Sequence, residues 1–427
     1  MKVLIIGNGG REHALAWKVA ENNSVTHVFV APGNAGTSLE NKVENVSINV
    51  TDTNALVTFA KNESIDLTIV GPEAPLVIGV VDAFEAEGLN IFGPSKDAAQ
   101  LEGSKAFTKN FLARHKIPTA SYGNFTEIAP AVAYIKEQGA PIVVKADGLA
   151  AGKGVILAQT EAEAITAVED MLAGNAFGDA GNRVVIEEFL VGEEASFICM
   201  VDGETVLPLA TSQDHKARDI GDLGPNTGGM GAYSPAPVVT PEIHDRIMNE
   251  VIMPTVKGMN AEGNRYRGFL YAGVMIANDG TPKVLEYNCR FGDPETQPIL
   301  MRLRSDLVSL CLSAIKGTLD AQTCDWDPRA SLGVVLAAGG YPYDYQKGDV
   351  ITGHDTTLDT HQKVFHAGTT IENGQIVTNG GRVLCAVSLG DTVSEAQVSA
   401  YDVVRKINWD KVYYRTDIGH RAVSRES

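Results

Sequence analysis

The sequence predicts an α/β protein whose N-terminal part, to about residue 100, is an open parallel sheet with helical crossovers. Two observations support this class: short β-branched runs alternate with helical segments, and each run ends at a Gly/Pro turn. The expected strands of this part are 3–6, 25–30, 66–70 and 89–92, and its first helix is 11–20. The turns 7–12, 32–36 and 71–75 then share the rim at the carboxyl ends of the strands, where open α/β sheets bind ligands.

The middle of the chain changes from a parallel to an antiparallel pattern. Hairpin turns are expected at 202–203 and 278–280. The expected helices are 105–115 and 161–173, and the expected strands are 142–146, 155–158, 184–186, 196–201, 206–210, 272–276 and 283–287. The last hundred residues add a strand at 332–337 and a helix near 394–406. With a length of 427 residues, we expect three domains, at 1–103, 104–325 and 326–427.

Composition excludes several classes of protein. The net charge of -18 makes nucleic acid and anionic lipid poor general partners, because both require phosphate neutralisation. The apolar stretches are too short to span a bilayer, and the glycine at position 7 comes too early for a signal peptide. Five scattered cysteines without a CxxC pair indicate a reduced, cytoplasmic protein.

The first glycine-rich loop, 7–12, suits a phosphate, because free backbone N–H groups and a helix dipole converge there. The alternative is a tight turn whose glycines serve packing only. A dinucleotide site is disfavoured, since Glu12 occupies the third glycine position and the second strand lacks a ribose-binding acid.

A second glycine-rich loop, 148–154, joins two strands. It differs from a P-loop in its spacing, in Gly154 at the Ser/Thr position and in the strand that follows. Such a hairpin can cover nucleotide phosphates, with Lys153 and Lys145 adding charge; the alternative is an ordinary hairpin with solvated lysines. The acidic segment 187–194 can hold an adenine edge and ribose hydroxyls, or it is a solvated turn.

Glu286, Asn288 and Arg290 alternate along one predicted strand, so their side chains share a face. Carboxylate and amide oxygens suit Mg²⁺, and an arginine can pair with a carboxylate or phosphate. The glycine-rich stretch 224–231 is expected to be a loop, either wrapping a small substrate or mobile at the surface. His215 has no Ser or Cys nucleophile motif beside it.

Five segments in order resemble the ATP-grasp superfamily and, within it, the glycinamide ribonucleotide synthetase (phosphoribosylamine–glycine ligase) family. The resemblance covers essentially the whole chain and is carried by VLIIGNGGREH (3–13), IVGPEAPL (69–76), KADGLAAGKG (145–154), GPNTGGMG (224–231) and NCRFGDPETQ (288–297). It implies a central ATP-grasp fold of two α+β lobes, with a mobile lid lobe at about 122–190, and a small C-terminal α+β domain.

The resemblance also implies the reaction. Glycine, 5-phosphoribosylamine and ATP would give glycinamide ribonucleotide, ADP and phosphate through glycyl phosphate, with Mg²⁺ or Mn²⁺, in a cytoplasmic and monomeric enzyme. No protein nucleophile is needed, since such chemistry requires charge neutralisation and alignment.

The family pattern implies the following site residues. ATP would be bound by Lys105, Lys145, Gly152, Lys153, Gly154, Glu187, Phe189, Leu190 and Glu193 or Glu194. Glu286 and Asn288 would bind metal, Arg290 the glycine carboxylate and Asp214 its amine. The phosphoribosylamine side would be lined by Gly9, Gly10, Asn34 and Glu73. The strand 270–276 lacks the metal-binding acid found in many members, which leaves one carboxylate with Asn288.

Three alternatives remain open from the sequence: another ATP-grasp ligase or carboxylase acting on a phosphoribosyl substrate, an inactive nucleotide-binding protein, and an NAD-dependent oxidoreductase. The acceptor pocket distinguishes the first, the presence of Lys105, Lys145, Glu286 and Asn288 disfavours the second, and Glu12 disfavours the third.

Overall fold

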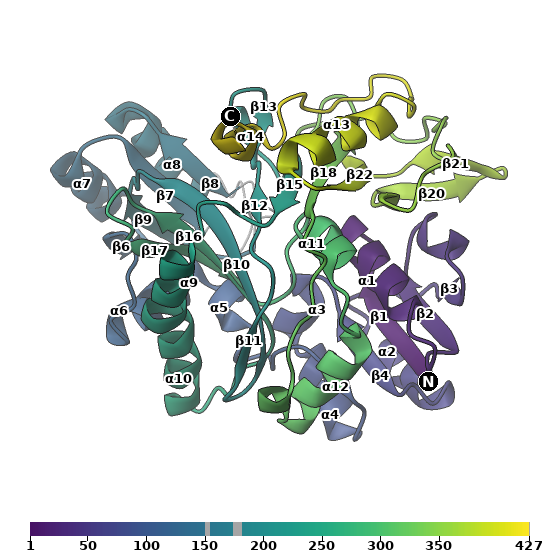
Figure 1. The fold of residues 1–427 in the computed structure, drawn as a ribbon. Helices are drawn as coiled ribbons and strands as arrows, with labels where there is room; N and C mark the ends of the chain where they lie inside the picture. The colour runs from purple at the N-terminus through teal and green to yellow at the C-terminus, as the bar shows by residue number, and fades with distance from the viewer. Residues whose placement is uncertain (150–153, 174–181, 427) are drawn as a thin grey trace.

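The computed structural model describes residues 1–149, 154–173 and 182–426 (Figure 1). Its first sheet is parallel, in the order β3-β2-β1-β4-β5, as predicted. The strands are β1 (Lys2–Gly7), β2 (His27–Pro32), β3 (Val43–Asn45), β4 (Leu67–Val70) and β5 (Ile91–Phe92). The helices of this part are α1 (Gly10–Ala20), η1 (Thr37–Leu39), α2 (Thr53–Asn62), α3 (Glu73–Ile78), α4 (Val80–Ala86) and α5 (Gln100–Gly103).

Both faces of this sheet are buried, which explains why its strands are continuously apolar. Leu4 and Ile6 belong to one hydrophobic core, and Val3 and Ile5 belong to another. The second core also contains residues of the central sheet and of the helices that follow it, so the first sheet is packed against the rest of the chain rather than standing alone.

A small sheet in the order β6-β9-β7-β8 is antiparallel throughout. Its elements are β6 (Tyr122–Phe125), α7 (Ile128–Gln138), β7 (Ile142–Ala146), β8 (Val155–Ala158), α8 (Glu161–Leu172) and β9 (Val184–Glu188). The two helices pack against it around their own hydrophobic core. The expected strands 142–146 and 155–158 are confirmed to the residue.

The central sheet has the order β11-β10-β16-β17 and is also antiparallel. Its strands are β10 (Glu193–Asp202), β11 (Val206–Pro208), β16 (Arg267–Ile276) and β17 (Pro282–Asn288). Helical segments around it are α6 (Lys105–Arg114), α9 (Pro241–Ile247), η3 (Met248–Ile252), α10 (Met253–Ala261), α11 (Thr296–Arg302), α12 (Leu307–Lys316) and η4 (Leu319–Ala321). Among the described residues, no helix is both long and apolar enough to cross a membrane.

The C-terminal sheet combines strands that are far apart in the chain, in the order β12-β15-β18-β22-β19. Two short strands come from the middle of the chain, β12 (Gln213–Asp214) and β15 (Gly231–Ser234), and three from its end, β18 (Ala330–Ala337), β19 (Gln362–His366) and β22 (Arg382–Gly390). The remaining elements are β13 (Ala217–Asp219), β14 (Leu223–Asn226), β20 (Thr369–Glu372), β21 (Gln375–Thr378), α13 (Val393–Val404) and α14 (His420–Glu426). This sheet therefore crosses the boundary expected at residue 325.

The stretch 224–231 was predicted to be a loop, and this prediction is wrong at both ends. Its first residues pair with β13 as part of β14, and its last residue begins β15. Glycine is required at Gly231, because a Cβ there would lie 2.6 Å from the Gly333 carbonyl oxygen and 2.8 Å from the Ile418 side chain. A glycine-rich segment thus forms strands where neighbouring backbone approaches closely.

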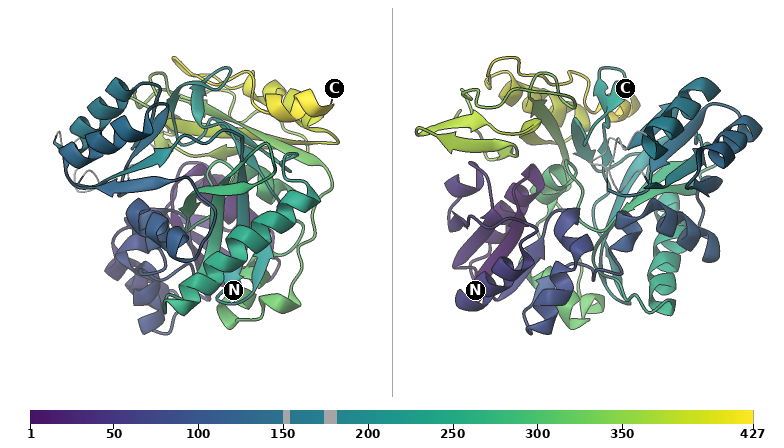
Figure 2. Two further views of the ribbon diagram at one scale, coloured as in Figure 1. Left: turned by 90° about the vertical axis from the view of Figure 1, so that its left-hand side faces the viewer. Right: turned by 180° about the vertical axis from the view of Figure 1, so that it is seen from behind.

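The C-terminal part lies over the N-terminal part, as the views from two sides in Figure 2 show. Two buried histidines join them: the backbone N–H of His366 on β19 donates to Nδ1 of His13 on α1, at 2.8 Å. His13 Nε2 lies 3.0 Å from Glu40, which also pairs with Lys363. Burial lowers the pKa of His366 to about 3 and also lowers that of His13, so the folded protein disfavours the charged form of both rings.

We expect this contact to weaken in acid. Below about pH 6.5 the unfolded chain binds more protons at His13 and His366 than the folded chain does, and for His366 this difference extends to about pH 3, so the free energy of unfolding falls as the pH falls. Despite burial, hydrogen bonds from His13 and Lys363 lower the pKa of Glu40 to about 2, which adds a loss in the same direction below about pH 4.5. Thermal unfolding measured from pH 8 to 4 should show a smaller drop in His366→Gln than in the unmodified protein. Equal drops would contradict this assignment.

Candidate active site

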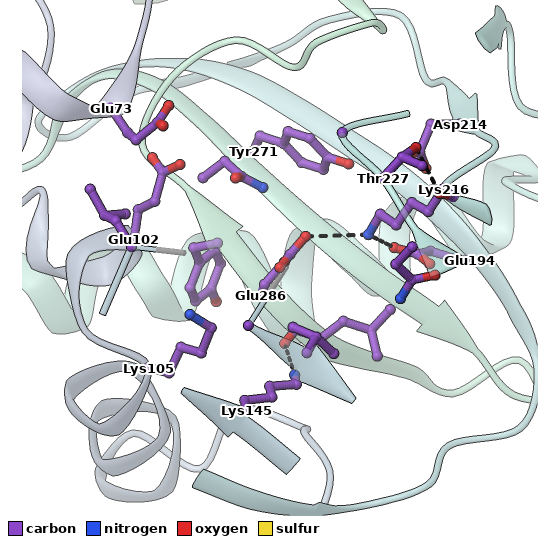
Figure 3. A pocket seen from close by; sticks show the side chains of 18 of the residues that line it. Glu73, Glu102, Lys105, Lys145, Glu194, Asp214, Lys216, Thr227, Tyr271 and Glu286 are labelled. Atoms are coloured by element: carbon purple, nitrogen blue, oxygen red, sulfur yellow. Dashed lines mark hydrogen bonds and ion pairs between the residues drawn. The ribbon is translucent and has the colours of Figure 1, made fainter. Parts of the chain in front are cut away.

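A cavity of about 710 Å³ lies where the small, central and C-terminal sheets meet the N-terminal part. Its size suits a nucleotide with a second small ligand. Its lining combines Glu73 from α3, Lys145 from β7, Glu286 from β17 and Tyr341 from the segment after β18. Figure 3 shows the lysines Lys105 and Lys145 on one side of the cavity and a cluster of carboxylates on the other.

Apolar side chains from the small sheet, from the connection between β9 and β10 and from β17 line part of the cavity. They are Val143, Val155, Leu157, Phe189, Leu190 and Leu285. Of the predicted nucleotide residues, Phe189, Leu190 and Gly154 therefore line the cavity, whereas Gly152 and Lys153 lie outside the described residues. An apolar lining beside exposed backbone suits a planar heterocyclic ring.

Glu187 also lines the cavity, but its carboxylate is already paired. It lies 2.9 Å from Nζ of Lys145 and 2.9 Å from Nζ of Lys109, and both lysines are buried. Burial lowers the pKa of Lys109 to about 8. We therefore interpret Glu187 as the residue that holds these two lysines in place, rather than as the acceptor for an adenine amine. This revises the role implied by the family resemblance.

Lys105 stands at the start of α6 and donates to the Gly148 carbonyl oxygen, at 2.9 Å. Among the described residues, no carboxylate lies within 4.0 Å of its amine. Burial lowers the pKa of Lys105, and the charge of Lys145 lowers it further. Two neighbouring ammonium groups in one cavity favour an anion with several oxygens, such as a polyphosphate.

Glu286 and Lys216 form the centre of the cavity. Nζ of Lys216 lies 3.2 Å from Glu286 and also pairs with Glu194 of β10. The charge of Lys216, acting against burial, lowers the pKa of Glu286 to about 2. Asn288, two residues further along β17, lines the same cavity as predicted. The donor set of Glu286 and Asn288 consists of hard oxygens, which fits a divalent cation.

Asp214 completes a group of four carboxylates around one lysine. Glu194, Asp214, Glu286 and Glu295 line the cavity with Lys216, so the group is negative overall when ionised. Burial raises the pKa of Asp214 well above its usual range, and the neighbouring Glu295 raises it further. Such a cluster favours a positively charged ligand, either an amine or a metal ion.

Arg290 joins the central sheet to the N-terminal part. Its Nε donates to Glu73 at 3.2 Å, and its Nη2 lies 3.0 Å from Glu102. Burial raises the pKa of Glu102 to about 7. Arg290 and Glu73, both expected to contact substrates, thus lie in contact, and Arg290 lines the cavity while it bridges two acidic side chains.

Four predicted site residues are not among the described residues that line the cavity. They are Gly9, Gly10, Asn34 and Glu193. Glu193 pairs with Arg425 and accepts a hydrogen bond from Gln213, which leaves its neighbour Glu194 facing the cavity. The Asn34 side chain donates to the carbonyl oxygens of Asn8 and His366 and accepts from the turn that follows it.

The glycines of the first loop have a packing reason. A Cβ on Gly9 would lie 2.8 Å from a Glu12 carboxylate oxygen, and one on Gly10 would lie 2.6 Å from the Gln297 amide nitrogen. The Gly9 N–H donates to Glu12 at 2.6 Å. This favours the packing alternative for these glycines, although their neighbour Arg11 does line the cavity.

Several lining residues were missed by the sequence analysis. Two of them had a usable signal: Lys109 follows Lys105 by four positions on one helix, and Lys216 follows Asp214 by two in an extended segment. Glu295 belongs to the segment 288–297 but was given no role, and Glu102, Tyr271, Tyr341 and Arg382 join the site through packing between segments that are distant in the chain. Tyr271 and Ser196 both hydrogen-bond Glu295, at 2.7 and 2.9 Å.

Comparison with protein families gives matches along most of the chain. The N domain, the ATP-grasp (A) domain and the C domain of phosphoribosylglycinamide synthetase match residues 1–102, 103–296 and 331–421. A phosphoribosylamine–glycine ligase of Vibrio parahaemolyticus is 71% identical over 426 residues, covering 100% of this chain and 99% of the relative. That of Escherichia coli K12 is 69% identical over 427 residues and covers both chains fully.

Solved structures resemble the chain over nearly its whole length. The crystal structure of phosphoribosylamine–glycine ligase from Thermotoga maritima has a TM-score of 0.85 and 35% identity, and the match covers 98% of this chain and 100% of that one. The biotin carboxylase domain of Hydrogenobacter thermophilus 2-oxoglutarate carboxylase, in complex with MgADP, has a TM-score of 0.74 at 16% identity over 97% of this chain and 91% of that one. The second likeness concerns the fold alone.

Proposed function

The chain belongs to the phosphoribosylglycinamide synthetase family, and on that premise we propose how its cavity joins glycine to 5-phosphoribosylamine. It is an ATP-dependent ligase that makes glycinamide ribonucleotide in purine biosynthesis. The observation that carries the proposal is the meeting, in one cavity, of paired lysines with a cluster of carboxylates around Glu286.

Two displacements account for the reaction. A glycine carboxylate oxygen attacks the γ-phosphorus of ATP, the bond to the β-phosphate oxygen breaks, and ADP leaves with that electron pair. The amine nitrogen of phosphoribosylamine then attacks the acyl carbon of glycyl phosphate, the carbon–oxygen bond breaks, phosphate leaves, and the nitrogen loses a proton. Neither step needs a protein nucleophile, so the protein contributes alignment and charge neutralisation.

The residues proposed to bind ATP are of two kinds, charged ones for its phosphates and apolar ones for its adenine. Lys105 and Lys145 bind the phosphates of ATP, and the apolar lining with Phe189 and Leu190 holds the adenine. Glu194 is the candidate for the ribose hydroxyls, and its present partner Lys216 has other carboxylates within reach. Gly154 belongs to the loop that would cover the phosphates.

Glycine carries one positive and one negative group, so its site requires a residue of each charge. Asp214, in the carboxylate cluster, attracts the ammonium of glycine, and Arg290 the carboxylate. Glu73 and Glu102 lie beyond Arg290 toward the N-terminal sheet, so we place phosphoribosylamine on that side. Arg11 lines the same region and replaces Gly9, Gly10 and Asn34 as our candidate contact there.

Members of the ATP-grasp superfamily use ATP with a divalent metal ion, and the donor set of this cavity fits one. We propose that Glu286 and Asn288 hold Mg²⁺ or Mn²⁺, supported by their position on one strand and by the ionised state of Glu286. An ion held there would neutralise phosphate charge as it is transferred.

We further propose the division into 1–103, 104–325 and 326–427, with a lid at about 122–190. The separate core of the small sheet supports the lid, while the shared C-terminal sheet argues for a rigid attachment of the third part. A monomer suffices, because residues of one chain line the cavity from all parts. A cytoplasmic location is supported by the five free cysteines.

Phosphate release from ATP and Mg²⁺ tests the function. We expect release only when glycine and phosphoribosylamine, made in place from ribose 5-phosphate and ammonia, are both present, with glycinamide ribonucleotide identified by mass. Activity with a different amine, or with bicarbonate, would instead indicate another ATP-grasp ligase or carboxylase. ATP binding without any turnover would indicate an inactive nucleotide-binding protein.

A further inference from the structure

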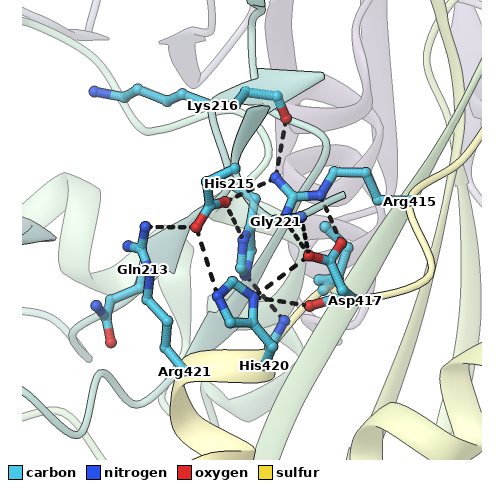
Figure 4. A network of polar contacts seen from close by, with 12 residues as sticks. Gln213, His215, Lys216, Gly221, Arg415, Asp417, His420 and Arg421 are labelled. Carbon is cyan, nitrogen blue, oxygen red and sulfur yellow. Dashed lines mark hydrogen bonds and ion pairs between the residues drawn. The ribbon is translucent and has the colours of Figure 1, made fainter. Parts of the chain in front are cut away.

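The extended segment that carries Asp214 and Lys216 has a second, buried side. Side chains alternate along an extended backbone, so Asp214 and Lys216 face the cavity while His215 between them points the other way. The His215 side chain is 1% exposed and lies against the C-terminal segment 415–421. Figure 4 shows Lys216 extending away from the polar network in which His215 and Arg415 lie.

His215 has a partner at each ring nitrogen, one in the C-terminal segment and one in the turn before β14. Its Nε2 accepts the backbone N–H of Gly419 at 2.9 Å, and its Nδ1 lies 3.3 Å from Asp222. Burial lowers the pKa of His215, in agreement with a neutral ring that donates from Nδ1. Gly419 has a φ of 86°, and a Cβ there would lie 2.5 Å from Leu332, so the position that presents this N–H requires glycine.

Arg415 closes the network from the other side. Its side chain is fully buried, and its Nη1 donates to the carbonyl oxygen of Ala217 at 3.0 Å and to Asp222 at 2.9 Å. Its Nε and Nη2 donate to Asp417, which in turn accepts from the backbone N–H of Gly221. The backbone on both sides of Lys216 is therefore tied to residues two hundred positions away.

A metal ion could in principle use three groups here. One ligand atom each from His215, Asp222 and His420 lies within 4.8 Å of the others. However, the two oxygens of Asp222 already accept from Arg415 and Arg421, and both nitrogens of His215 have partners. The guanidinium groups supply the positive charge that a metal would bring, so we interpret the network as a mechanical link.

We propose that His215 is a positioning residue of the active site: anchored on Gly419 and Asp222, it orients Asp214 and Lys216 in the cavity. The inference rests on the proposed function, because it concerns the site that binds glycine. It assigns the C-terminal segment a part in catalysis without any contact with substrate. Loss of this anchor lets Lys216 leave Glu194 and Glu286, and a displacement of about 1 Å in such a site can cost up to about 100-fold in rate.

The test compares two substitutions of one side chain. His215→Leu removes both hydrogen bonds, whereas His215→Gln places an amide oxygen where Nε2 accepts from Gly419. We expect His215→Leu to lower kcat at least tenfold and to raise the KM for glycine, with the KM for ATP changed less than twofold. We expect His215→Gln to recover kcat to within about threefold of the unmodified protein.

A matched control separates positioning from stability. Glu426 accepts hydrogen bonds from the backbone N–H groups of Val393 and Ser394 and holds the C-terminal helix without touching the network. Glu426→Gln should lower Tm yet leave kcat within twofold. A kcat for His215→Leu within twofold of the unmodified protein, or a loss that follows Tm equally in both variants, would overturn the proposal.

A second readout does not depend on turnover. Trace acetylation, read by mass spectrometry, reports how well the Lys216 amine is held, with the half-exposed Lys61 as internal reference. We expect Lys216 to react several times faster relative to Lys61 in His215→Leu and at the unmodified rate in His215→Gln; unchanged labelling would contradict the proposal even if the unmodified enzyme proved inactive. Should His215→Leu not fold, Asp222→Asn is judged by the same two measurements.

Discussion

Glu286→Ala is expected to lower kcat about a thousandfold or more with the fold intact. Glu286 is the carboxylate at the centre of the cavity, fully ionised because its pKa is about 2, and it is paired with Lys216. Its removal takes away the charged oxygen ligand proposed for the metal and leaves Lys216 closer to the phosphates, so charge at the transferring phosphoryl group is no longer balanced. A thousandfold loss corresponds to about 4 kcal/mol of transition-state stabilisation, the upper end of what removal of one such group costs.

The measurement is steady-state phosphate release as a function of Mg²⁺ and Mn²⁺ concentration. Glu286→Gln keeps the side-chain shape and one oxygen, and we expect it to be nearly as slow, with a higher metal concentration for half-maximal rate. Glu242→Ala, at an exposed carboxylate of α9, is the control for loss of a charge as such. A metal dependence unchanged in Glu286→Ala would show that the metal is held elsewhere.

Arg290→Ala is expected to raise the KM for glycine about 100-fold, while the KM for ATP changes less than threefold. Arg290 is the cation proposed to pair with the glycine carboxylate, and losing a charge-assisted pair in a buried site costs about 2–5 kcal/mol. Equal increases of both KM values would instead place Arg290 on the phosphates. Arg290→Lys keeps the charge but not the two-sided geometry, so we expect an intermediate value.

The same substitution should change stability in a pH-dependent way. Arg290 lowers the pKa of Glu102, which burial otherwise raises, so without Arg290 this carboxyl group stays protonated to higher pH in the folded protein. A group whose pKa is raised in the folded state stabilises the fold at low pH, and this stabilisation is lost as the pH rises through that pKa. The drop in Tm caused by Arg290→Ala should therefore be larger at pH 8 than at pH 6.

Much of the fold was predictable, because its strands obey local rules. Continuous apolar runs ending at Gly/Pro turns predicted the parallel first sheet, and hairpin turns predicted the antiparallel pairs β10–β11 and β16–β17. The C-terminal sheet was not predictable, since β12 and β15 are short, β12 pairs with β15, and β15 in turn pairs with β18, which begins at Ala330. Strand propensity contains no information about such distant partners.

The site was predictable where a motif placed several polar side chains on one strand. Glu286 and Asn288 share the cavity because alternation along β17 sends both the same way, and Arg290, two residues beyond the end of this strand, lines the cavity with them. What the sequence could not supply is which charges neutralise one another. The pairing of Glu187 with two lysines and that of Arg290 with Glu102 both join residues more than forty positions apart, and the first of them changes the role proposed for Glu187.

The mixed C-terminal sheet has a consequence for synthesis on the ribosome. β15 ends at Ser234, and its partner β18 begins at Ala330, so β15 leaves the ribosome nearly a hundred residues before the strand it must pair with. At about 5–20 residues per second, this wait lasts several seconds. All strands of the first sheet are synthesised early. In contrast, the segment that carries Asp214 and Lys216 gains its contacts with Arg415 and Gly419 only after residues 415–419 emerge. A nascent chain therefore acquires the ability to consume ATP only when its synthesis is nearly complete.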